Sequence, residues 1–147
     1  MIAVIQRCSR GKVRVSEKVV GEIKNGLVIL LGVQKGDTEK DADFLINKIS
    51  GLRIFSDEND KMNLSIKDVN GSALVISQFT LCGDTKKGRR PSFIKAALPE
   101  HGNRLYEYFM SEMKKDGVPI ECGEFGAMMD VALVNNGPVT FILNSKD

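Results

Sequence analysis

A short segment, Ser77-Gln78-Phe79-Thr80-Leu81, places two hydroxyl groups and an amide side chain together at the end of an apolar run. One interpretation is a strand end whose side chains alternate between the inside and the outside. The other uses the backbone, because the N–H groups of Phe79 and Thr80 can converge on an oxyanion where a strand breaks into a loop. Ser77 and Gln78 would then orient a substrate. Thr80 is less attractive as a nucleophile, since a nucleophilic hydroxyl needs an adjacent base and the segment has no histidine.

The densest group of cations is the segment Lys86-Lys87-Gly88-Arg89-Arg90-Pro91. Gly83 and Gly88 would allow its backbone to approach a phosphate group closely. A solvated surface loop is the alternative interpretation. If the loop binds nucleic acid, a patch of this size suits the end of an RNA strand better than a long duplex.

Metal and cofactor chemistry find no support in the residue types. His101 is the only histidine, and no two of the three cysteines have the CxxC spacing of a zinc site. Neither GxGxxG nor GxxxxGK[ST] occurs, so no nucleotide cofactor is expected. His101 follows Pro99 and Glu100, which is typical of a surface residue at the start of a helix.

The segment Asn135-Asn136-Gly137-Pro138 lies between two runs typical of strands, Val131–Val134 and Val139–Leu143. Its composition predicts a hairpin turn, with the proline opening the second strand. Since X–Pro bonds are cis in only ~5–6% of folded cases, nothing in the composition or spacing indicates a cis bond here.

Two helices are predicted from periodicity. The first begins with Asp37 or Thr38 as its cap and ends near Gly51, because Ala42, Leu45, Ile46 and Ile49 follow helical spacing. The second begins near Pro99 and ends at Lys114-Lys115, before Gly117. Its core face is predicted to contain four residues: Leu105, Tyr108, Phe109 and Met113.

Strands are predicted at the remaining apolar runs, and they do not alternate strictly with the helices. The predicted strands are Ile2–Gln6, a hairpin over 13–23, Leu27–Leu31, Arg53–Phe55, Ala73–Thr80, Ile120–Cys122, Val131–Val134 and Val139–Leu143. Leu27–Leu31 is apolar throughout, which indicates a strand covered on both faces. The pattern therefore predicts an α+β fold with a mostly antiparallel or mixed sheet, rather than a doubly wound parallel one.

The composition fits one globular domain over residues 1–147 with one core, since 42% of the residues are hydrophobic and 27% are charged. A net charge of +2 is too small for a general affinity for polyanions, so any nucleic-acid contact should be local. Three widely spaced cysteines favour reduced thiols and a cytoplasmic protein. No signal peptide or membrane-spanning segment is apparent.

Ser77-Gln78-Phe79-Thr80-Leu81 together with Asn136-Gly137-Pro138-Val139-Thr140 resembles the paired signature of D-aminoacyl-tRNA deacylases. The resemblance extends from end to end of the chain. It also includes Ala3-Val4-Ile5-Gln6-Arg7, Lys87-Gly88-Arg89-Arg90-Pro91-Ser92-Phe93 and Phe125-Gly126-Ala127. Family members often have an acid in place of Asn136 and a polar residue in place of Met128.

The resemblance implies a barrel-like deacylase fold and a homodimer that hydrolyses the ester between tRNA and a D-amino acid, or glycine mischarged on tRNA(Ala). It implies no cofactor, and neither DNA nor a membrane as a partner. Gly137-Pro138 would be a cis dipeptide that enters the partner subunit's pocket and excludes L side chains, with Arg7 fixing it. The Phe79 and Thr80 amides would face the ester, beside Ser77 and Gln78. Phe125 and Met129 would lie near the terminal adenosine.

The missing histidine base has a chemical consequence if this resemblance holds. The terminal ribose has its own 2′-hydroxyl beside the ester, so the substrate can supply the group that organises or activates the attacking water. Protein amides would then stabilise the oxyanion. Two alternatives stay open: an RNA-end binding module without turnover, and an esterase with Thr80 as its nucleophile. On the first of these, the Lys86, Lys87, Arg89 and Arg90 cations would bind RNA phosphates without any reaction following.

Overall fold

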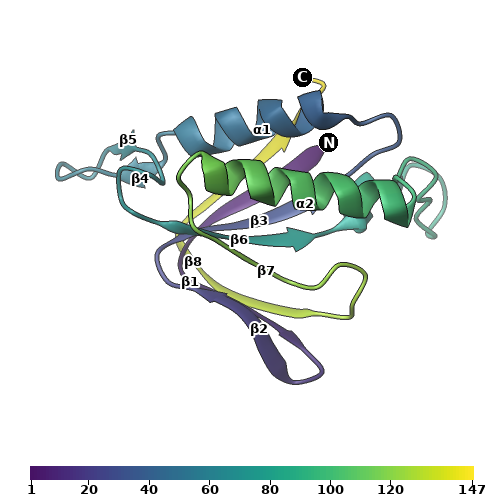
Figure 1. The fold of residues 1–147 in the computed structure, drawn as a ribbon, viewed down its shortest axis with the longest axis horizontal. Helices are drawn as coiled ribbons and strands as arrows, with labels where there is room; N and C mark the ends of the chain where they lie inside the picture. The colour runs from purple at the N-terminus through teal and green to yellow at the C-terminus, as the bar shows by residue number, and fades with distance from the viewer.

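A computed structural model describes residues 1–147 as a curled six-stranded sheet with two helices on one face (Figure 1). The sheet strands are β1 (Ile2–Val15), β2 (Lys18–Ile23), β3 (Gly26–Gly32), β6 (Ser72–Ser77), β7 (Ile120–Cys122) and β8 (Asp130–Asn144). The other elements are α1 (Glu39–Gly51), a small hairpin of β4 (Phe55–Ser56) and β5 (Met62–Leu64), the 3₁₀ turn η1 (Phe79–Cys82) and α2 (Pro99–Lys115).

The long strand β1 organises the sheet. One of its edges pairs antiparallel with β3 through residues 2–8 and with β2 through residues 11–15. Its other edge pairs antiparallel with β8. β3 continues the sheet to β6 and β7 through parallel pairs, so the strand order is β2-β1-β3-β6-β7, with β8 beyond β1.

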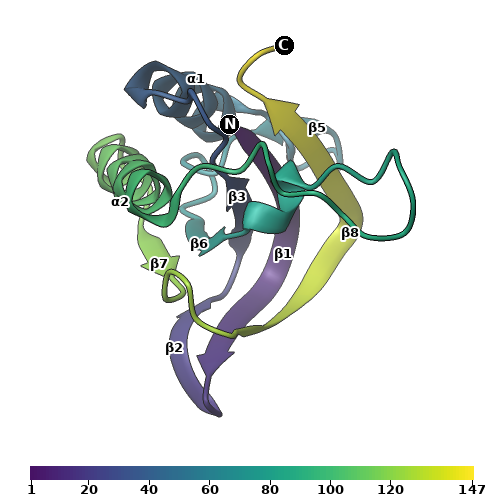
Figure 2. The same ribbon diagram turned by 90° about the vertical axis from the view of Figure 1, so that its right-hand side faces the viewer.

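The main core lies between the two helices and one face of the sheet (Figure 2). Alternate residues of β3 point to this face, namely Leu27, Ile29 and Leu31, and all three are buried. They pack with buried residues of α1 and α2 such as Leu45 and Phe109. Neither helix is long and apolar enough to cross a membrane.

A second, smaller core occupies the opposite face, where the sheet curls on itself. It contains Cys8, Val13, Ile23, Val28, Leu74 and Ile76. The curl brings β2 against β7 so closely that a Cβ at Gly21 would lie 2.6 Å from the Cys122 carbonyl oxygen. The single predicted core is thus divided between the two faces. The predicted α+β class with a mixed, barrel-like sheet and two main helices is confirmed.

The start of α1 is tied to the end of the chain. Thr38 caps the helix, and the Asp41 carboxylate accepts a hydrogen bond from the Thr38 N–H at 2.8 Å, as in a capping box. Asp41 also accepts hydrogen bonds from Ser145 Oγ and Lys146 Nζ. Burial alone would raise the pKa of Asp41, but these hydrogen bonds outweigh it and hold that pKa well below its usual range.

The predicted hairpin turn at residues 135–138 is wrong. Residues 130–144 form one continuous strand, because β1 is long enough to pair with both halves of it. The strands predicted at Val131–Val134 and Val139–Leu143 are therefore two parts of β8. Asn, Gly and Pro mark an irregularity within this strand instead of a reversal.

Two element boundaries and one core residue also differ from the prediction. β6 ends at Ser77 rather than Thr80, because Ser77 is the last residue that pairs with β3, opposite Leu31, and the chain turns into η1 from Phe79. On α2 the buried tyrosine is Tyr106, which shares the face of Gly102, Phe109 and Met113, whereas Tyr108 is half-buried. The short strand expected at 53–55 is found at Phe55–Ser56.

Candidate functional site

A cavity of about 540 Å³ opens where β6 ends. Its walls come from the end of β6, the segment before α2, and the loop between β7 and β8. No charged side chain lines it, and nine of its 13 lining residues are hydrophobic. The lining residues are Ile76, Ser77, Gln78, Phe79, Ala96, Ala97, Pro99, Phe125, Gly126, Ala127, Met128, Met129 and Val131.

The floor of the cavity is the break between β6 and η1. The Gln78 N–H still bonds to the Leu31 carbonyl at 2.8 Å, as if the strand continued, and the chain then turns into η1. The first N–H groups of a helical turn have no partner within it. No loop, cap or side-chain acceptor takes the N–H of Phe79 or Thr80, and both residues are exposed. These two amides are therefore available to an oxyanion.

The side-chain hydroxyl of Thr80 has a partner that is not a base. The Gln78 amide donates a hydrogen bond to Thr80 Oγ1. The only histidine lies in the first turn of α2, as predicted, but it is half-buried there and its Nε2 donates to the Asp37 carbonyl at 2.7 Å. The geometry offers Thr80 no group that could accept its proton.

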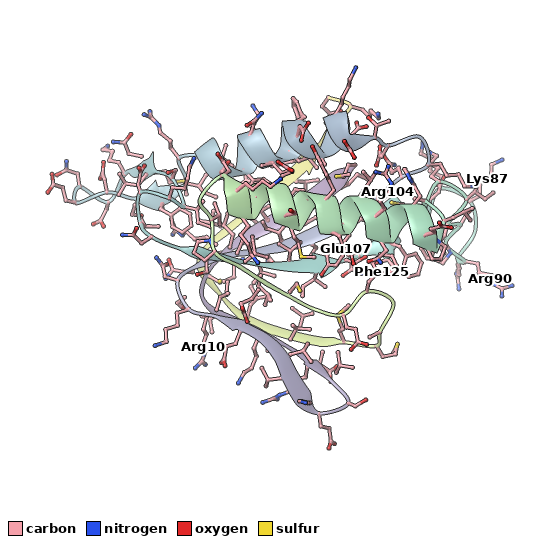
Figure 3. The ribbon with its side chains drawn as sticks, in the orientation of Figure 1. Arg10, Lys87, Arg90, Arg104, Glu107 and Phe125 are labelled. Atoms are coloured by element: carbon pink, nitrogen blue, oxygen red, sulfur yellow. The ribbon has the colours of Figure 1, made fainter.

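The opposite wall is formed by Phe125 and Met129. The Phe125 ring lies under α2 (Figure 3) and packs against Tyr106, with ring centroids 5.9 Å apart. Tyr106 is anchored in turn, because its hydroxyl donates to the Val75 carbonyl at 2.9 Å. Burial raises the pKa of Tyr106 far above its ordinary value, so this phenol remains a neutral donor. The wall is thus a fixed apolar surface suited to a flat, uncharged ring.

The basic loop projects beside this cavity. Its ends are closed by two backbone hydrogen bonds between Asp84 and Ser92, and Gly88 has a positive φ of 67° at its tip. Lys86, Lys87, Arg89 and Arg90 are all exposed, and none has a salt-bridge partner. Figure 3 shows Lys87 and Arg90 pointing away from the protein.

The Gly137-Pro138 dipeptide lies on a bulge of β8. Gln6 pairs with Thr140 and Cys8 with Asn135, so Arg7 alone stands opposite residues 136–139. The Gly137–Pro138 bond is cis, and Gly137 has a φ of 134°, a backbone conformation that residues with side chains rarely adopt. A Cβ there would meet Val139 Cγ2 at 2.6 Å and Arg7 Nη2 at 3.1 Å. Both residues of the dipeptide are exposed.

Two side chains fix this bulge. Arg7 donates from Nε to the Asn136 carbonyl at 3.0 Å and from Nη1 to the Ile54 carbonyl at 2.8 Å. Asn135 accepts from the Val139 N–H at 2.9 Å and donates to Thr140 Oγ1 at 3.0 Å. Hydrogen bonds to Asn136 before the dipeptide and to Val139 and Thr140 after it therefore hold it in place on the surface.

Comparison with known proteins shows which family has this arrangement. Residues 4–144 match the family described as D-Tyr-tRNA(Tyr) deacylase. The chain belongs to this family. It is 56% identical over 146 residues to the D-aminoacyl-tRNA deacylase of Thermotoga petrophila, covering 99% of this chain and 98% of the relative. It is 53% identical over 146 residues to that of Bacillus cereus, covering 99% and 100%.

A solved structure has the same fold as this deacylase-family chain. The protein named "c-Myc DNA Unwinding Element Binding Protein" superposes with a TM-score of 0.93 and 37% identity, over 98% of both chains. The resemblance given above from sequence motifs is thus confirmed over the full length. As a member of the deacylase family, the chain is an enzyme of the hydrolase class.

The deacylase fold brings together only some of the predicted site residues. Ser77, Gln78, Phe79, Phe125 and Met129 line one cavity, and Thr80 follows directly. The basic loop joins this group through Phe93, whose ring packs edge-on against Phe79 with centroids 5.0 Å apart. Gly137, Pro138 and Arg7 lie outside the cavity of their own chain.

Asn135 and Tyr106 are positioning residues that the sequence analysis missed. The sequence offers only a weak signal for Asn135, since an asparagine two positions before Gly137 is equally typical of a turn. For Tyr106 the signal was its spacing of i+3 and i+7 to Phe109 and Met113. No group of three or more His, Cys, Asp or Glu side chains is arranged to hold a metal ion.

Proposed function

We propose that this chain hydrolyses the ester that joins a D-amino acid, or glycine, to the terminal ribose of tRNA. The observation that carries the proposal is the uncharged cavity lined by Phe79, together with the unpartnered N–H groups of Phe79 and of Thr80, which follows it directly. Membership of the deacylase family over residues 4–144 supports the substrate class. The terminal adenosine would lie between these amides and the wall of Phe125 and Met129.

The chemistry follows from what the cavity contains and lacks. The Phe79 and Thr80 amides stabilise the negative charge on the carbonyl oxygen, as donors aimed at a developing oxyanion do. One such donor is worth ~10²–10³ in rate in a well-studied protease, so two are a substantial part of catalysis. No side chain that lines the cavity can act as an acid or base. The ribose 2′-hydroxyl therefore organises or activates the attacking water.

Selection for D-amino acids comes from Gly137-Pro138 of a second copy. The dipeptide is exposed, lies outside its own chain's cavity, and is held by Arg7 and Asn135, all of which suit a group presented to another molecule. Its backbone would occupy the space that an L side chain requires. Exclusion of this kind rejects every L-amino acid whatever its side chain, whereas glycine has no side chain to exclude.

A homodimer is part of the same proposal. Phe141 and Ile142 are exposed on β8, close to the dipeptide in sequence, and Val134 is exposed on its other side. Exposed large apolar side chains concentrated along one strand are typical of an interface. A second copy packed along β8 would cover such side chains and bring each dipeptide toward the other copy's site.

The decisive experiment uses one tRNA charged separately with the D and L forms of an amino acid, and with glycine. The purified chain should release the D-amino acid and glycine and leave the L-amino acid attached. Release of both enantiomers at similar rates would contradict the proposed selection. Absence of release from all three would contradict the activity itself.

A second candidate is a nucleic-acid end-binding protein without turnover. The name of the structure at 37% identity, a DNA unwinding element binding protein, favours it, and so do the four unpaired cations of the basic loop. The two candidates differ in turnover. Binding of tRNA with no release of amino acid, under conditions where a related deacylase is active, would select the second.

A further inference from the structure

Large apolar side chains are exposed around the mouth of the cavity. Ile94, Leu98 and Met128 are 75%, 71% and 91% exposed, and Phe79 and Phe93 are exposed as well. Phe79 and Met128 line the cavity itself, Phe93 packs on Phe79, and Leu98 stands between the lining residues Ala97 and Pro99. Exposed apolar residues concentrated in this way mark a binding surface.

The same segment is strongly basic. Lys86, Lys87, Arg89 and Arg90 precede Phe93, and Lys95 follows it. None of the five forms a salt bridge. The one acid of the segment, Asp84, is engaged locally, since its carboxylate accepts from the Lys86 N–H at 2.9 Å. The segment therefore combines apolar surface with unpaired positive charge.

We propose that Phe93, Ile94 and Leu98 form a platform on which the unpaired nucleotides before the terminal adenosine stack. This inference rests on the proposed function and extends it to a second part of the substrate. None of the three side chains lines the cavity that would take the terminal adenosine. Phe93 and Leu98 adjoin residues that line it, and Ile94 follows Phe93, so the platform lies next to the cavity on the path proposed for the preceding nucleotides.

The chemistry of the surface matches single-stranded nucleic acid. Proteins that hold single-stranded nucleic acid combine cations that follow the phosphates with aromatic rings on which the bases stack. The basic loop beside the platform supplies the cations, and Phe93 supplies the ring. Packing against Phe79 restricts the Phe93 ring, so less freedom is lost when a base stacks on it.

Two substrates separate the platform from the cavity. One is tRNA charged with a D-amino acid, and the other is adenosine esterified with the same D-amino acid, which lacks the preceding nucleotides. Phe93→Ala and Ile94→Ala should each raise KM for the tRNA about 5- to 10-fold, the low end of the range for one stacked base, with kcat unchanged. Both should leave hydrolysis of the aminoacyl-adenosine unchanged.

Matched variants provide the controls. Phe93→Tyr keeps the ring and should restore the KM of the unmodified chain. Phe44→Ala removes a phenylalanine on α1 that is 41% exposed, compared with 39% for Phe93. It should leave KM and kcat unchanged for both substrates. Sedimentation of each variant tests whether the molecule's association state has changed.

Three results would overturn the platform. Equal losses on both substrates would mean that Phe93 acts only through its packing on Phe79. A KM increase that accompanies a shift toward monomer would mean that a second copy covers the surface. Unchanged kinetics on both substrates would mean that no base stacks there.

The activity and the platform can fail separately. If the unmodified chain hydrolyses neither substrate, the proposed function fails. The platform is then tested by the binding of a short fluorescent single-stranded RNA. Phe93→Ala should weaken that binding about 5- to 10-fold, and equal binding by the variant would refute the platform.

Discussion

Neutralising the basic loop should reduce the salt dependence of tRNA binding by a calculable amount. The variant replaces Lys86, Lys87, Arg89 and Arg90 by glutamine. Each cation is exposed and lacks an acidic partner, so each is free to contact one phosphate. The slope of log K against log salt should then fall by about 2.8 for single-stranded contacts or about 3.6 for duplex contacts.

This slope converts into affinities that are easily measured. Between about 50 and 200 mM salt, the unmodified chain should lose about 50- to 150-fold more affinity than the variant does. The assay is the fluorescence anisotropy of labelled, uncharged tRNA titrated with protein at four salt concentrations. Uncharged tRNA avoids any contribution from turnover.

The control variant has the same net charge. Four other exposed lysines without salt-bridge partners can be changed to glutamine instead, which also lowers the formal net charge of +2 by four. They are Lys18, Lys24, Lys48 and Lys61. If the loop acts locally, this control keeps the original slope. If both variants reduce the slope equally, the effect comes from overall charge rather than from the loop. If the loop variant keeps the original slope, the loop is a solvated surface segment that does not contact phosphate.

Four further predictions concern the site and the fold. Thr80→Ala should keep deacylation within about tenfold, since the amide and not the hydroxyl is assigned to catalysis; an ester trapped on Thr80 would contradict this. A terminal 2′-deoxyribose should reduce the rate by more than that mutation does, and equal rates would end the substrate-assisted mechanism. Arg7→Ala removes two hydrogen bonds from a charged donor to the segment around the dipeptide, worth about 1.5–3 kcal/mol each, and should allow hydrolysis of L-aminoacyl-tRNA; retained selectivity in steady-state assays would oppose it. Asp41→Asn should lower the free energy of unfolding by about 2 kcal/mol at pH 7. Because folding lowers the pKa of Asp41, the stability that its carboxylate contributes is lost progressively as the pH falls below ~4. Urea denaturation should therefore find a smaller difference in free energy of unfolding between the two chains at pH 3 than at pH 7. A difference that stays constant with pH would contradict this prediction.

The sequence predicts elements well where local spacing decides the structure. Thr38 and the apolar period of Ala42, Leu45 and Ile49 locate α1, and the cap is found as expected. Prediction from the sequence fails where pairing with a distant strand determines the structure of a segment. Asn135–Pro138 carry the same local signals in a turn and in a bulge, and the length of β1 selects the bulge.

The same distinction applies to the candidate site, where local order is predictable from the sequence and contacts between distant segments are not. The order Ser77-Gln78-Phe79-Thr80 is visible in the sequence, but the residue at which the strand ends is not, because the last strand pair joins Ser77 to Leu31 in a distant segment. The contacts of Arg7 with the carbonyls of Asn136 and Ile54 join three distant segments, and no periodicity within any one of them predicts such contacts. The motif resemblance implies only that Arg7 fixes the dipeptide, because a family motif summarises the whole fold; the contact with Ile54 comes from the structure.

The pairing of β1 with β8 has a consequence for how the molecule is made. Ile2 pairs with Asn144, at the other end of the chain, so one edge of β1 has no partner until synthesis is nearly complete. Pairings so distant in sequence form slowly. Until β8 arrives, β1 presents an open edge that can pair with other chains. A nascent or truncated chain that ends before residue 130 should therefore be prone to aggregate, and the surface dipeptide can take shape only as the final strand docks.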